Sequence, residues 1–186
     1  MRFVIAAVLL AASIAADAQE RQIFRREVIP GPIEEVWKAW TTPEGIKTFL
    51  APDARVDLRP GGAYELVLDP SAPEGQRGTE GMTVMGMVPR SMLSFTWNGP
   101  PTLPAETRKH RTLVVVRFNA VNDGETMVTL VNTGWGSSKE WDAFYIASSR
   151  FWPTAVRSLM KRFDEGPVNW EQRLKAQKEA ASAPKQ

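Results

Sequence analysis

Side chains able to do polar chemistry are few in this sequence. Asn132, Tyr64 and Tyr145 fall among the apolar positions of expected strands and helices. They could polarise a carbonyl group by hydrogen bonding, but amides and phenols are poor bases at neutral pH. The inward faces that we predict contain no Asp, Glu, His or Lys, so we expect no catalytic residue. Each of the three polar residues could equally be a hydrogen-bonded group in or beside a core.

The single histidine and the paired acidic residues have simpler explanations than catalysis. His110 stands in the mixed-charge stretch ETRKHRT just before an expected strand, which favours a solvated loop over a catalytic imidazole. Glu34 and Glu35 are adjacent, so they suit the positive end of a helix dipole better than an acid–base pair. One histidine and no cysteine also predict no metal site, and we expect no cofactor.

The overall charge gives no sign of a polyanionic partner. The formal net charge is +2, and Lys and Arg form no stripe along the chain. A small excess of this kind is weak evidence for a nucleic acid or an anionic membrane. We therefore expect no nucleic-acid partner.

The N-terminus, MRFVIAAVLLAASIAADAQE, reads as a secretory signal peptide. A cationic start precedes an apolar run and the pattern Ala16-Asp17-Ala18, which predicts residues 1–18 as a leader cleaved after Ala18. The run is shorter than the roughly twenty residues of a membrane-spanning helix, and no later segment is more apolar. We expect a periplasmic or secreted protein without stable membrane insertion after cleavage.

The rest of the chain divides into one domain, residues 19–168, and a polar tail, residues 169–186, expected to be a frayed helix or disordered. Without cysteine, the domain must fold by its hydrophobic core alone.

Apolar periodicity and turn residues predict the order of the elements. A strand at 22–29 leads to a helix beginning near Pro32, and a short second helix has Thr42 as its N-cap and Pro43 at its first position. Six strands follow, the last two joined by a hairpin turn at 122–124. A long linker, residues 98–110, is either slack or a lid over a binding site.

A long helix closes the domain and carries the stretch EWDAFYIASSRFW. We expect Ser137 and Glu140 to form a capping box at its start and the helix to run to about Phe163. Large aromatic residues bracket Ser148 on one face, so this face either packs closely on the sheet or covers a cavity. Pro153 removes one backbone hydrogen bond and should bend the helix.

Five phrases, in this order, carry a resemblance to a known family. They are VWKAWTTPEGIKTFLAP, LRPGGAYEL, MLSFTW, VTLVNTGWG and EWDAFYIASSRFWPTAVRSLMKRFDEG. The sequence resembles the START-like (SRPBCC) superfamily and, within it, homologues of the activator of the heat-shock-chaperone ATPase; polyketide cyclases and Bet v-type proteins are relatives. The resemblance implies an α+β helix-grip fold, in which a curved antiparallel sheet wraps around the C-terminal helix and leaves a cavity between them.

The resemblance also implies positions that line such a cavity. Phe49 and Leu50 stand where many relatives have paired tryptophans, so the mouth is less aromatic here, and Asn132 stands where relatives often have histidine. With the aromatic face of the long helix, the candidate ligand-binding residues are Trp40, Phe49, Leu50, Tyr64, Leu66, Trp97, Val116, Phe118, Asn132, Trp141, Tyr145, Ser148 and Trp152.

Three functions follow from these observations. The favoured one is an exported protein that holds a small hydrophobic or aromatic molecule. The second is a lyase or cyclase acting on a hydrophobic substrate in the same cavity, for which no acid or base is in place. The third is an accessory protein in the cell envelope with an unknown protein partner.

Overall fold

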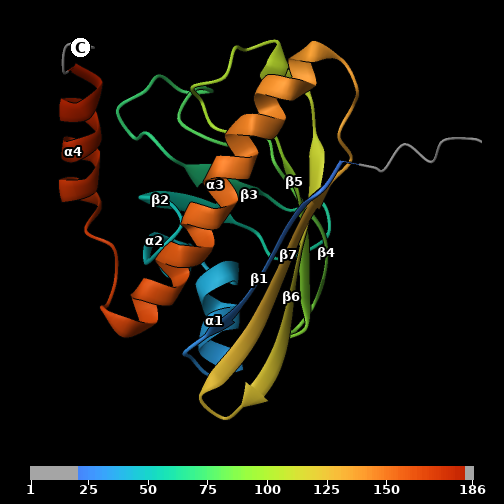
Figure 1. The fold of residues 1–186 in the computed structure, drawn as a ribbon, viewed down its shortest axis with the longest axis vertical. Coiled ribbons are helices and arrows are strands. Elements are labelled where there is room, and N and C mark those ends of the chain that lie inside the picture. Colours follow the sequence, from blue (N-terminus) through green and yellow to red (C-terminus); the bar gives the residue numbers. More distant parts are fainter. Residues whose placement is uncertain (1–20, 183–186) are drawn as a thin grey trace, which may run out of the picture.

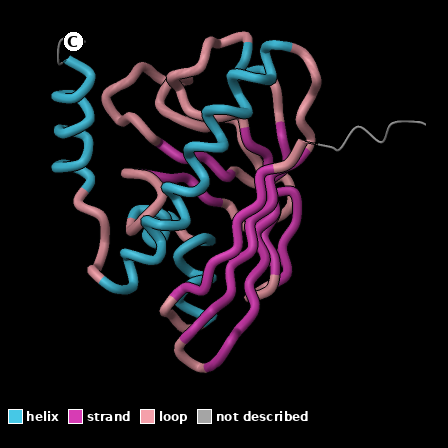
Figure 2. The backbone as a smooth tube through the Cα atoms, viewed as in Figure 1, coloured by secondary structure: helices cyan, strands magenta, loops and turns pink. Residues whose placement is uncertain are grey.

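The computed structural model describes residues 21–182, and the predicted leader lies outside them. The fold is of the α+β class, as expected: an antiparallel sheet is crossed by one long helix (Figures 1 and 2). The elements, in order, are β1 (Ile23–Ile29), α1 (Ile33–Thr41), α2 (Pro43–Lys47), β2 (Asp53–Val56), β3 (Tyr64–Val67), β4 (Val84–Val88), β5 (Met92–Trp97), the 3₁₀ turn η1 (Thr107–Lys109), β6 (Thr112–Asn122), β7 (Glu125–Thr133), α3 (Lys139–Asp164) and α4 (Trp170–Ser182).

The main sheet has five strands in the order β1-β7-β6-β5-β4, all antiparallel. Its longest pairing is the β6–β7 hairpin, whose turn is fixed by a hydrogen bond of 2.9 Å from the Gly124 amide to Asn122 Oδ1. The first strand, β1, lies at the edge of the sheet and pairs with the last strand, β7. This topology confirms the helix-grip fold.

A separate two-stranded sheet of β2 and β3 extends the wall beyond β4. A bridge between Ala63 and Thr83 and backbone hydrogen bonds between residues 61–64 and 82–84 connect it to the main sheet. This small sheet and the loop after it stand opposite the C-terminal part of the chain, which becomes important for the site.

The two short helices begin as the sequence predicts. Thr42 caps α2, because its Oγ1 accepts a hydrogen bond of 2.9 Å from the Gly45 amide. Helix α1 buries Val36, Trp37 and Trp40 against the core, as the spacing of its apolar residues indicates.

Helix α3 crosses the concave face of the sheet and runs unbroken through Pro153 (Figure 1). The predicted capping box at its start is wrong. Ser138, not Ser137, is the N-cap, and its side chain caps no backbone amide. Glu140 therefore lies only two positions into the helix, and its carboxylate accepts a hydrogen bond from the Ser138 hydroxyl instead of reaching back to the backbone.

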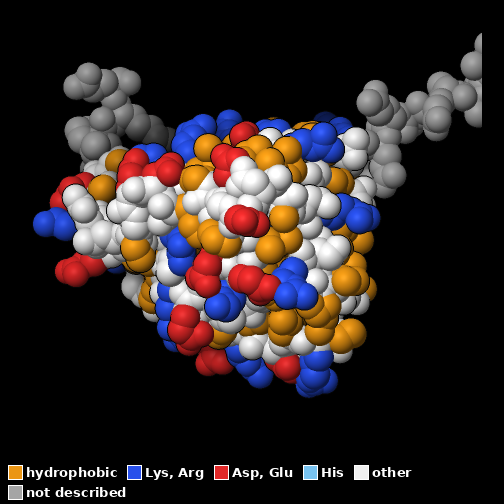
Figure 3. Space-filling view, turned by 90° about the horizontal axis from the view of Figure 1, so that it is seen from below, with side chains coloured by type: hydrophobic (Ala, Val, Ile, Leu, Met, Phe, Trp, Pro, Cys, Tyr) orange, Lys and Arg blue, Asp and Glu red, His pale blue; other side chains and the backbone are white. Residues whose placement is uncertain are grey.

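The polar tail forms a helix, α4, which stands beside α3 (Figure 1). Most of its residues are exposed, in keeping with its polar composition. On the face of the molecule seen in Figure 3, basic and acidic side chains are interspersed. No described helix is long and apolar enough to cross a membrane.

Candidate functional site

The thirteen predicted site residues lie mainly inside the hydrophobic core. Eleven of them are buried, and Trp141 and Tyr145, near the start of α3, are half-buried. Their rings pack on one another and on other core rings: the centroids of Trp97 and Trp152 are 4.7 Å apart, and those of Tyr64 and its neighbour Phe95 are 4.1 Å apart. The space between the sheet and this part of α3 is thus occupied by the protein's own side chains.

Asn132 is the centre of a buried hydrogen-bond network. Its Nδ2 donates to Thr112 Oγ1 at 2.9 Å and to the Leu113 carbonyl at 3.0 Å, while its Oδ1 accepts from Trp152 Nε1 at 3.1 Å. Both amide hydrogens and the amide oxygen therefore have partners inside the fold. Asn132 joins β6, β7 and α3. This geometry favours the role of a hydrogen-bonded core residue over that of a ligand-binding residue.

Ser148 is fully buried where α3 crosses the end of β5. Its Oγ accepts a hydrogen bond of 2.9 Å from Trp97 Nε1. A small hydroxyl residue is needed here because the indole approaches the helix closely. At Ser148 the aromatic face covers a packed core.

The two tyrosines also have partners within the chain. The Tyr64 hydroxyl donates a hydrogen bond of 2.9 Å to the Trp40 carbonyl at the end of α1. Burial raises the pKa of Tyr64 well above its ordinary value, so the side chain stays a neutral donor. The Tyr145 hydroxyl donates to the Gln22 carbonyl just before β1.

A large cavity lies on a different face of α3 from the one that packs on the sheet. It is enclosed by α3, α4, the segment after α2, the loop after β3 and the loop after β5. Its volume is about 830 Å³. Of the thirteen predicted residues, only Phe49 and Leu50 line it. That these thirteen residues contact a ligand stays a prediction.

Both helices turn one regular face toward this cavity. From α3 come Ala147, Arg150, Phe151, Thr154, Ala155 and Ser158, and from α4 come Trp170, Arg173, Leu174, Gln177 and Lys178. Each set follows the 3/4 spacing of a single helical face. The remaining wall is formed by Phe49, Leu50, Pro52, Leu68, Asp69, Ala72, Gln76, Pro100, Pro101 and Thr102.

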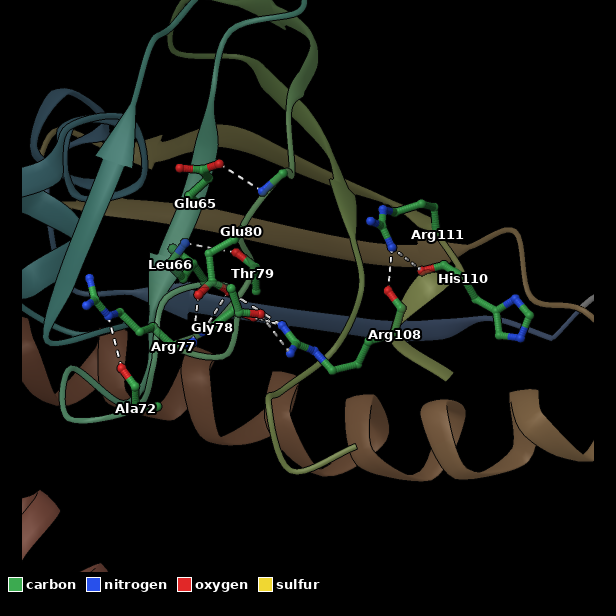
Figure 4. Close-up of polar contacts among 12 residues, drawn as sticks. Glu65, Leu66, Ala72, Arg77, Gly78, Thr79, Glu80, Arg108, His110 and Arg111 are labelled. Atoms are coloured by element: carbon green, nitrogen blue, oxygen red, sulfur yellow. Dashed lines mark hydrogen bonds and ion pairs between the residues drawn. The ribbon is translucent and has the colours of Figure 1, made fainter. Parts of the chain in front are cut away.

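The loop at residues 98–110, expected to be either slack or a lid, is tied down at its far end. Arg108, in η1, points toward the loop after β3, where Nη2 donates to the Gly78 carbonyl and lies 3.5 Å from Glu80 Oε2 (Figure 4). The Glu80 carboxylate in turn accepts hydrogen bonds from the backbone amides of Arg77 and Gly78. Burial acts to raise the pKa of Glu80, but these bonds and the charge of Arg108 outweigh it and leave the pKa lowered. The clasp holds two cavity-lining loops together.

His110 lies away from the cavity. Its ring stacks on Trp141 with centroids 4.4 Å apart, beside the first turn of α3. Its backbone carbonyl accepts a hydrogen bond from Arg111, and its side chain points away from the Arg108 clasp (Figure 4). Within residues 21–182, no three His, Cys, Asp or Glu residues are placed to hold a metal ion.

With the geometry established, comparison with known proteins gives the family. Residues 30–164 match the family described as activator of Hsp90 ATPase homolog 1-like protein. The chain belongs to this family. No curated protein matches the sequence significantly.

Solved structures of the same fold include proteins from several bacteria. Protein MLL2253 from Mesorhizobium loti has a TM-score of 0.60 at 19% identity, covering 80% of this chain and 100% of its own. The Aha1 dimer from Colwellia psychrerythraea has a TM-score of 0.59 at 18% identity, covering 78% of this chain and 98% of its own. CalU16 from Micromonospora echinospora has a TM-score of 0.55 at 22% identity, covering 87% of this chain and 86% of its own. Identities this low show a shared fold.

The cavity wall contributed by α4 lies beyond the family match, which ends at residue 164. This wall was not predicted from the sequence, because Trp170 and Leu174 are the two large apolar residues of an otherwise polar and alanine-rich α4. The signal that could have found it is the spacing of Trp170 and Leu174, four residues apart on one helical face.

Proposed function

We propose that this protein binds a small hydrophobic or aromatic molecule in the cavity between α3 and α4. The observation that carries the proposal is a space of about 830 Å³ with apolar side chains on several walls, among them Phe49, Leu50, Leu68 and Phe151. Cavities of roughly 300–1,000 Å³ with apolar walls are typical of small-molecule sites.

The cavity is suited to binding because contacts within the chain hold its walls in place. Arg108 fixes the loop that carries Pro100 and Pro101. The packing of Phe151 on the core residue Trp97 fixes α3. A preformed site loses less conformational entropy when a ligand binds.

A lyase or cyclase acting in the same cavity is the weaker alternative. Asp69 is the acidic residue among the described lining side chains, and no His or Cys accompanies it. The hydrogen bond from the Ser71 side chain, with one from the Ser71 amide, lowers the pKa of Asp69. A carboxylate with a lowered pKa is a poor general acid or base at neutral pH, so the lining favours binding.

We also propose that the protein acts outside the cytoplasm, on the strength of the leader expected at residues 1–18. An exported protein does not meet a cytosolic chaperone, so the partner named in the family description does not transfer to this chain. A protein partner in the cell envelope is the remaining alternative.

The proposal is tested by titration with N-phenylnaphthylamine, a neutral apolar dye whose emission rises in an apolar site. We expect a saturable increase with one site per chain and a raised melting temperature at saturating dye. Native mass spectrometry of protein purified from its own host should show a reproducible added mass. No saturable signal and no shift in melting temperature across a panel of apolar ligands would contradict the proposal.

A further inference from the structure

We propose that the ligand is an amphiphile with an anionic head group and that α4 supplies the wall that recognises this head group. The inference rests on the proposed function, since it specifies what the same cavity holds.

Helix α4 is attached across the cavity by hydrogen bonds at several points. The Val168 amide, just before it, donates to the Thr48 carbonyl at 2.9 Å, and Trp170 Nε1 donates to the Lys47 carbonyl. Further along, Arg173 Nη1 donates to Ser158 Oγ of α3 at 3.2 Å. Near the end, Lys178 Nζ donates to Ser71 Oγ at 3.4 Å. The helix therefore spans the opening between α3 and the loop after β3.

Both acidic residues of α4 lie off its cavity-lining face. Its cavity-lining face carries Arg173 and Lys178 and no acidic residue, whereas Glu171, Lys175 and Glu179 lie off that face. Trp170 and Leu174 add the apolar part of the same face.

Arg150 of α3 adds a third cation to the lining, opposite α4. In the described part of the chain its guanidinium forms no ion pair. The acidic residue of the lining, Asp69, already accepts two hydrogen bonds from Ser71.

Three cations and one hydrogen-bonded carboxylate leave an excess of positive charge beside an apolar cavity. A carboxylate, sulfate or phosphate head group on an apolar tail complements this arrangement, because guanidinium and ammonium groups bind such oxygens by charge-assisted hydrogen bonds.

The experiment measures displacement of bound N-phenylnaphthylamine by four ten-carbon competitors: decanoate, decyl sulfate, decanol and decyltrimethylammonium. We expect one or both anions to displace the dye at concentrations about tenfold lower than decanol, and the cation to be the weakest. The advantage of the anions should shrink with added salt, while decanol should be unaffected.

The charge-removing variants are Arg150→Gln and Lys178→Gln, with Lys175→Gln on the other face of α4 as the matched control. Each lining variant should weaken the anionic competitors about fivefold relative to decanol, a comparison that corrects for any change in the affinity of the dye itself. Lys175→Gln should change neither affinity. Equal displacement by anions and decanol, or unchanged anion affinity in both lining variants, would overturn this inference while the proposed function stands. Failure of the wild-type protein to bind the dye at all would overturn both.

Discussion

Trp97 Nε1 donates a hydrogen bond of 2.9 Å to Ser148 Oγ and so joins the last residue of β5 to the middle of α3. Both side chains are fully buried. The contact fixes where the long helix lies on the sheet. Because this face of α3 is packed on the sheet, the candidate cavity lies along the neighbouring face, which carries Ala147, Phe151 and Ala155.

Replacing Ser148 should destabilise the protein in two distinguishable ways. Ser148→Ala removes the acceptor and leaves the buried Trp97 N–H without a partner, which should cost about 1–3 kcal/mol of unfolding free energy. Ser148→Leu must in addition be fitted into a filled space, and overpacking adds about 1–3 kcal/mol. Chemical denaturation followed by far-UV circular dichroism measures both changes.

The matched control is Ser149→Ala, because the Ser149 hydroxyl bonds to the Ile146 carbonyl of its own helix. It should change stability by less than about 0.5 kcal/mol. A Ser148→Leu protein as stable as the wild type would show that Ser148 faces empty space.

Asn132→Ala should be among the most destabilising single substitutions in the fold. It removes the acceptor of Trp152 Nε1 and the donors to Thr112 Oγ1 and the Leu113 carbonyl at once, for a loss of about 2–4 kcal/mol. Denaturant titration at fixed pH provides the measurement. A loss below about 1 kcal/mol would mean that water can replace the amide in this network.

The Glu80 clasp makes part of the stability depend on acid. Because the folded-state pKa of Glu80 is lowered, its contribution is present above the ordinary carboxyl pKa of 4.5 and is lost as the pH falls through the folded value. Glu80→Gln should be about 1–2 kcal/mol less stable than the wild type at neutral pH, and this difference should shrink on acidification. Glu74→Gln, an exposed carboxylate of the same loop, serves as the control. A difference that is constant between neutral and acidic pH would rule out the clasp as its cause.

Export is tested by the N-terminus of the protein isolated from its host. Edman sequencing should begin at Gln19, because the predicted cleavage follows Ala18. Met1 at the N-terminus of cytoplasmic protein would contradict both the leader and the proposed location.

Local signals in the sequence were enough to predict most of the elements. Thr42 and Pro43 mark the start of α2, and the turn at 122–124 marks the β6–β7 hairpin, because capping and turn preferences act over a few residues. The resemblance to relatives supplied the way in which strands and α3 assemble.

The cavity could not be placed from the same signals. The bond between Trp97 and Ser148 joins residues 51 positions apart, and a periodic pattern cannot show that an aromatic face is filled by its own rings. Likewise, α4 is held by scattered hydrogen bonds rather than by an apolar stripe, so its composition indicated only a polar tail. Arg150 was not predicted because an exposed arginine on a helix is the ordinary case.

The most direct test of the account is the affinity for N-phenylnaphthylamine of Ala147→Phe, compared with that of Ala143→Phe. Ala147 lines the cavity, whereas Ala143 lies four residues earlier on α3, is exposed and is not part of the lining. We predict that the new ring at residue 147 fills ligand space and weakens binding by about tenfold or more, while the ring at residue 143 leaves the dissociation constant unchanged. Equal affinities in the two variants, with both proteins folded, would contradict the placement of the ligand between α3 and α4.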